Sequence, residues 1–81
     1  MAAGDVVLTL AIEGGSTKTV TLDSATRGLS RTFVTVVDPA VDTDTEWAVT
    51  QINSLANYIL SEANQQARTE NATARTFTAA T

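Results

Sequence analysis

The sequence predicts a small α+β domain in which an antiparallel β-sheet of three or four strands packs against one long α-helix, with an extended C-terminal arm. Three observations favour this fold. Residues 5–37 contain short segments of alternating apolar and polar residues, residues 43–68 carry apolar residues at helical spacing, and residues 69–81 are rich in Ala and Thr. No repeat or linker divides the chain, so we expect one domain over residues 1–81.

Residues 5–13 and 17–23 are predicted to form a β-hairpin. Alternate residues of the first strand, beginning with Val6, are apolar and point to one face, which is the period of a β-strand. A Gly-Gly-Ser turn follows, and glycines accept the positive φ that tight hairpins require. In the return strand Val20 and Leu22 face the core, and three threonines occupy the other face.

Residues 29–37 are predicted to form a third strand with Phe33 buried. Three of its last four residues are valines, which favours a strand that is partly covered on both faces. Pro39 then ends the strand, because proline lacks the N–H that a β-ladder uses. For residues 69–81 the alternatives are a fourth strand, a docked arm or a frayed tail.

Residues 43–68 are predicted to form one amphipathic helix. Thr43 and Glu46 have the spacing of a capping box, and Arg68 suits the negative end of the helix dipole. The apolar side of this helix is expected to pack on the sheet through Ile52, Leu55 and Ile59. The sheet residues expected to contact it are Leu8, Leu10, Val20, Leu22 and Phe33.

A second stripe on this helix predicts a protein–protein interface. Trp47, Gln51 and Tyr58 lie together on this stripe, and Glu62 is the only charged residue between Trp47 and Ala67. Interfaces are enriched in Trp and Tyr and depleted in Lys and Glu. The alternative is an ordinary amide- and hydroxyl-rich surface, with both aromatic residues lying over the edge of the sheet.

Residues 69–81 predict an arm that becomes ordered against another chain. The segment holds several β-prone residues and has no Gly or Pro. The edge of a small sheet can accept an added strand, which binds through backbone hydrogen bonds. Phe77 is then the anchor, and Arg75 points the same way toward the rim. The alternative is a disordered terminus.

The composition argues against several classes of function. A net charge of −4 with only five basic residues disfavours binding to nucleic acid or to an anionic membrane. No Cys or His is present, which removes thiol chemistry and the commonest metal ligand and general base. No apolar run approaches the length of about 20 residues that spans a bilayer. We therefore expect no enzymatic activity and no cofactor.

One acidic cluster superficially has the spacing of a calcium loop. Asp42, Asp44 and Glu46 are separated by single residues, as are the first ligands of an EF-hand. Trp47 and Asn53 stand where that loop needs a glycine and a bidentate glutamate. The cluster is therefore interpreted as helix capping, and no metal site is predicted.

The composition resembles that of small structural proteins encoded by tailed bacteriophages. The chain has 15 threonines, 13 alanines, a single lysine and no Cys or His. Residues 1–5, which lead directly into a strand, and the Ala/Thr-rich residues 72–78 have the same character. The resemblance implies a virion component, such as a decoration or head–tail protein, that works as many symmetric copies.

These observations together predict a non-enzymatic structural or assembly protein that acts through contacts with other protein chains. Its partners are expected to be further copies of itself or a larger assembly. The alternative is a small monomeric regulatory or ligand-binding domain of a bacterium. We expect the protein in the virion if a phage encodes it and in the cytoplasm otherwise, because residues 1–5 lack the basic region of a signal peptide.

Overall fold

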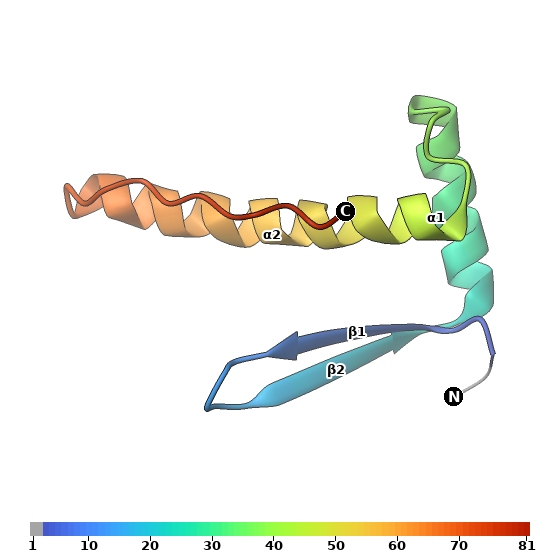
Figure 1. Ribbon diagram of the computed structural model, residues 1–81, viewed down its shortest axis with the longest axis horizontal. Coiled ribbons are helices and arrows are strands. Elements are labelled where there is room, and N and C mark those ends of the chain that lie inside the picture. Colours follow the sequence, from blue (N-terminus) through green and yellow to red (C-terminus); the bar gives the residue numbers. More distant parts are fainter. Residues whose placement is uncertain (1–2) are drawn as a thin grey trace. The chain divides into compact units, whose positions relative to one another are not determined.

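The structure, a computed structural model, describes residues 3–81 as a β-hairpin followed by two helices (Figure 1). The elements are β1 (Val6–Ala11), β2 (Thr17–Leu22), α1 (Ser24–Val37) and α2 (Asp44–Thr69). The chain divides into two compact units, Met1–Pro39 and Ala40–Thr81. The α+β class is confirmed, but the sheet formed by the described residues has two strands rather than three or four.

The hairpin has the pairing that the alternating sequence predicts. β1 and β2 are antiparallel, with Leu8 opposite Val20 and Thr9 opposite Thr19. Directly opposed residues point to the same face, so Leu8, Val20 and Leu22 share one face, and the four threonines of the strands share the other with Val7 and Ala11. The predicted strands are therefore confirmed, although β1 is shorter at both ends than the sequence pattern indicated and β2 ends one residue earlier.

The turn between the strands closes through two backbone hydrogen bonds. The Ile12 N–H donates to the Ser16 carbonyl at 2.9 Å, and the Gly15 N–H donates to the Ile12 carbonyl at 2.8 Å. Gly14 has φ +75°, a conformation that glycine adopts at little cost. The glycine-rich sequence therefore supplies the reversal that was expected of it.

The predicted third strand is wrong, because residues 29–37 belong to α1. A side-chain cap starts this helix: the Asp23 carboxylate accepts a hydrogen bond from the Thr26 N–H at 2.8 Å. The Asp5 carboxylate accepts a second one, from the Ser24 N–H, at 3.2 Å. Two of the N–H groups that a helix start leaves without backbone partners are thereby satisfied.

The β-branched residues of α1 are compatible with the helix for local reasons. The hydroxyls of Thr32 and Thr35 donate to the carbonyls four residues earlier, at 3.0 and 2.9 Å. Leu29, Phe33 and Val37 recur every four residues, which is also the spacing of a helical stripe. A short apolar run fits both periods, and the cap at Asp23 was the signal that favoured the helix.

The long helix is confirmed, and its bounds lie within one residue of those predicted. Thr43 is its N-cap: the Thr43 hydroxyl oxygen accepts from the Glu46 N–H at 3.2 Å. The same hydroxyl donates to the Glu46 carboxylate at 3.0 Å, whereas the sequence predicted that this carboxylate would accept from the Thr43 N–H. The cap therefore works as predicted, but its returning bond uses a different donor.

At its C-terminus α2 ends in a Schellman motif that reverses the chain. Asn71 has φ +56°, and its N–H donates to the Arg68 carbonyl at 3.2 Å. The Ala72 N–H donates to the Ala67 carbonyl at 2.7 Å, which completes the motif. The residues that follow run back along α2 as an extended arm (Figure 1).

Few apolar side chains are buried in the part of the chain that the structure describes. Val41 and Trp47 are the buried hydrophobic residues there, at 7% and 6% exposure. Phe33 is 72% exposed, so its predicted burial is wrong. The apolar side of α2 is exposed as well, and its predicted core residues Ile52, Leu55 and Ile59 are not buried.

Candidate protein–protein interface

One side of α1 carries an exposed apolar stripe. Its members are Leu29, Phe33, Val36 and Val37, and each is between 72% and 80% exposed. Their spacing of four, seven and eight residues from Leu29 places them on one side of the helix. Such spacing is usual for the buried side of a helix, so this side of α1 is chemically suited to contact with another apolar surface.

The polar side of α1 is less exposed than this apolar stripe. Arg27, Ser30 and Arg31 have intermediate exposure, whereas the four apolar residues are exposed. A helix that lies on its own core shows the opposite pattern. The apolar stripe is thus the side of α1 that remains accessible to a partner.

The hairpin also has an exposed apolar face. Leu8, Leu10 and Val20 lie on it and are 40%, 55% and 58% exposed. An isolated two-stranded hairpin is marginally stable in water, because two strands cannot cover their own apolar face. Among residues 3–39 no hydrophobic residue is buried, so this unit has no core of its own.

The three residues of the stripe predicted on α2 differ in their exposure. Trp47 is 6% exposed, Gln51 is half-buried and Tyr58 is 63% exposed. Tyr58 is therefore accessible to a partner, while Trp47 is not. Sequence spacing places all three on one side of α2, but it does not determine how much of each is covered.

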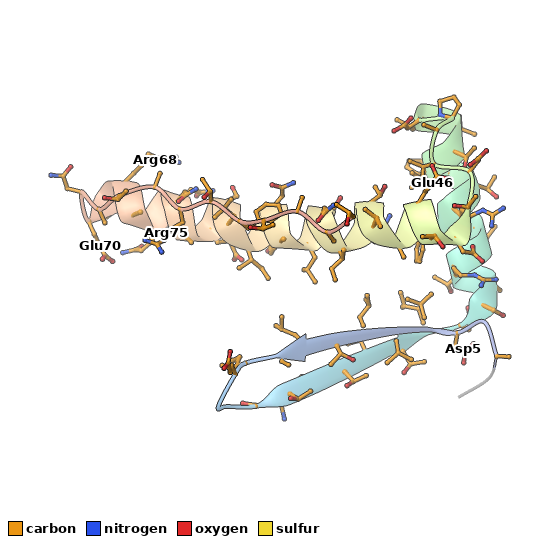
Figure 2. The ribbon with its side chains drawn as sticks, in the orientation of Figure 1. Asp5, Glu46, Arg68, Glu70 and Arg75 are labelled. Atoms are coloured by element: carbon orange, nitrogen blue, oxygen red, sulfur yellow. The ribbon has the colours of Figure 1, made fainter. Side chains whose placement is uncertain are left out.

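The structure places Arg75 and Phe77 on the arm beside α2. The Arg75 N–H donates to Asn64 Oδ1 at 2.7 Å, and the Arg75 carbonyl accepts from Asn64 Nδ2 at 3.2 Å. Figure 2 shows Arg75 beside the helix. Phe77 is 38% exposed. The arm is therefore ordered against the helix of its own chain, whereas the sequence analysis expected another chain.

A second asparagine holds the end of the arm in the same way. The Ala80 N–H donates to Asn53 Oδ1 at 2.8 Å, and the Ala80 carbonyl accepts from Asn53 Nδ2 at 3.2 Å. The sequence analysis did not identify either asparagine as a binding residue. Their separation of eleven residues, which is close to three helical turns, was the available signal.

Other kinds of site find no support in the described chain. No three His, Cys, Asp or Glu side chains of residues 3–81 come together in an arrangement that could hold a metal ion. Neither described helix is both long and apolar enough to cross a lipid bilayer. Comparison of the chain with protein-family models, with curated proteins and with solved structures finds no match.

Proposed function

We propose that this protein is a non-enzymatic structural protein that assembles with further copies of itself. The observation that carries the proposal is the α1 stripe, whose four apolar residues are 72–80% exposed. Contiguous exposed apolar surface of this kind marks an interaction site. A second copy brings an identical stripe, and pairing the two removes both from water at once, which is the main favourable contribution to protein association.

The hairpin unit gives independent support for assembly. It has no buried hydrophobic residue among residues 3–39, and its apolar face and the α1 stripe are both exposed. Tyr58 adds an exposed aromatic residue on α2, and aromatic residues are frequent anchors of interfaces. Only 17% of the residues are charged, so few charges need to be desolvated when such faces meet.

Within this proposal the protein is a virion component of a tailed bacteriophage, such as a decoration or head–tail protein. The support is compositional: Thr and Ala together dominate the chain, one lysine is present, and Cys and His are absent. A virion uses one small chain in many symmetric copies, which agrees with a chain that exposes the same apolar faces in every copy.

Light scattering of the full chain, after size-exclusion chromatography, tests the assembly. We expect a mass well above the 8.5 kDa of one chain. Phe33→Gln should weaken association at least about tenfold, because a buried aromatic residue at an interface is typically a hot spot. Thr32→Gln is the matched control: Thr32 is the exposed neighbour of Phe33 and is already polar, so its replacement removes no apolar side chain from the stripe.

A wild-type mass of 8.5 kDa at every concentration would contradict the proposal. It would favour the alternative, a monomeric bacterial regulatory or ligand-binding domain. Equal weakening by both glutamine variants would show that the assembly does not use the α1 stripe. Circular dichroism of each variant establishes whether its helices are retained.

A further inference from the structure

The α2 helix binds an extended polypeptide through two asparagine side chains. Each amide donates one hydrogen bond and accepts one, and both bonds go to the backbone of a single arm residue: Asn64 pairs with Arg75, and Asn53 pairs with Ala80. These four bonds use only backbone atoms of the arm. We call residues 53–64 of α2 the asparagine track.

The spacing of the two asparagines matches the rise of an extended chain. From Asn53 to Asn64 the α-helix rises through eleven residue steps, about 16.5 Å. From Arg75 to Ala80 an extended chain advances five residue steps, about 16.5 Å. The track therefore fixes the register and the extended shape of whatever chain lies on it, because a chain of different rise would miss the second asparagine.

The surface between the two asparagines is apolar and partly covered. Ala56 and Leu60 lie on the same side of the helix as Asn53 and Asn64, and both are half-buried. The arm contributes Phe77, its only large apolar residue. All arm residues from 72 to 81 remain exposed, so the arm lies on the surface of α2 and can leave it without opening a core.

We propose that in the assembled protein the arm of one copy occupies the asparagine track of another copy. This inference rests on the proposed function, since it names a second contact between copies that associate through their α1 stripes. The arm of a second copy carries the same residues, so it makes the same four hydrogen bonds in the same register. Exchange of an identical element between copies is a low-cost route to assembly for that reason.

The Schellman turn is where the two arrangements differ. Asn71, at φ +56°, directs the arm back onto its own helix, a left-handed conformation that asparagine adopts more readily than most other non-glycine residues. An exchanged arm releases Asn71 from that conformation. Within one chain the short turn gives the arm a high local concentration, and association of copies through their α1 stripes raises the concentration of arms from neighbouring copies.

Spin-label distance measurements on the full chain test the exchange. The sequence has no cysteine, so Asn57→Cys and Thr81→Cys place labels only at the two chosen positions. Asn57 is exposed one helical turn from Asn53, and Thr81 follows Ala80. The doubly labelled chain is mixed in denaturant with an excess of unlabelled chain and refolded, so that copies are randomly combined.

We expect a short distance between the labels in the undiluted protein and its loss after dilution, because an exchanged arm then lies on an unlabelled neighbour. Persistence of the short distance in a protein that light scattering shows to be assembled would overturn the exchange and leave the proposed function standing. Persistence in a single chain of 8.5 kDa would overturn both. Absence of the short distance even without dilution would overturn the binding of the arm to the track.

Hydrogen exchange on unlabelled full-length protein provides the matched control. The double variant Asn53→Ala with Asn64→Ala should remove the protection of the Arg75 and Ala80 amides, which donate to these side chains. Gln65→Ala removes a side-chain amide from an exposed position on a different side of the same helix and should leave both amides protected. Equal protection in the two variants would show that the asparagines do not hold the arm.

Discussion

The helices α1 and α2 begin alike and end differently. In each, a side-chain oxygen of the N-cap accepts a hydrogen bond from the N–H three residues later, from Thr26 to Asp23 in α1 and from Glu46 to Thr43 in α2. At the other end, α1 stops at Asp38, which is extended and precedes a proline, whereas α2 ends in a turn that reverses the chain.

This difference between the helix ends decides whether a helix is covered by another segment of its own unit. The reversal at Asn71 returns the arm along α2, where Asn53 and Asn64 hold it. The α1 helix gains no such arm, and its stripe of four apolar residues stays exposed. The two helices thus show that the exposure of a helix side depends on how the helix ends as well as on which residues that side carries.

Matched leucine substitutions in α1 and α2 are expected to give the largest difference in effect between the two helices. Leu60→Ala should destabilise the arm on α2 by about 1–2 kcal/mol, less than at a fully buried site because Leu60 is half-buried. Leu29→Ala, in the exposed stripe, should leave the arm unchanged and weaken association instead. Amide exchange at Ala80 reports the first effect, and light scattering reports the second. Loss of amide protection at Ala80 in both variants would mean that the α1 stripe also affects the binding of the arm to α2.

A smaller effect of opposite sign is expected within α1. Gly28 lies inside the helix, and a Cβ atom added there would meet nothing within 4 Å. Gly28→Ala should therefore stabilise α1 by about 0.5–1 kcal/mol, because alanine loses less backbone entropy on forming a helix. Thermal unfolding followed by circular dichroism measures the change. A lower melting temperature would show that the site is occupied by a neighbour in the assembled protein.

The smallest effect concerns pH and distinguishes the two caps. Hydrogen bonds from the Thr26 side chain and N–H hold the pKa of the Asp23 carboxyl below its ordinary value. Because the pKa is lower in the folded state, the cap contributes fully above the unfolded value of about 3.9 and loses its contribution as pH falls through the folded value. In α2 the group that accepts the corresponding backbone N–H is the Thr43 hydroxyl, which does not titrate.

An acid titration of the Thr26 amide by NMR checks this expectation. Its resonance should move below about pH 4 as Asp23 takes up a proton. Asp23→Asn keeps a good capping residue that carries no titratable proton, so the movement should disappear while α1 remains helical. A transition of equal size in the Asn variant would assign it to another carboxyl group.

The sequence by itself determined the local features whose signals lie within a few residues. Alternation with a Gly-Gly turn defined the hairpin, and the Thr43 cap with helical spacing defined α2 to within one residue. The error at residues 29–37 arose because a valine-rich run fits a strand and a helical stripe equally well. The signal that favours the helix, the cap at Asp23, lies outside this run.

Only the tertiary structure decided which sides are covered and where the arm lies. The pairing of Asn53 with Ala80 joins residues that are distant in sequence, and periodicity alone gives neither the burial of Trp47 nor the exposure of Phe33. Periodicity gives a side chain's direction around its own helix, but coverage depends on which other segment returns to that side. Here the left-handed conformation of one residue, Asn71, sends the arm back onto α2 and so gives Asn53 and Asn64 their partners.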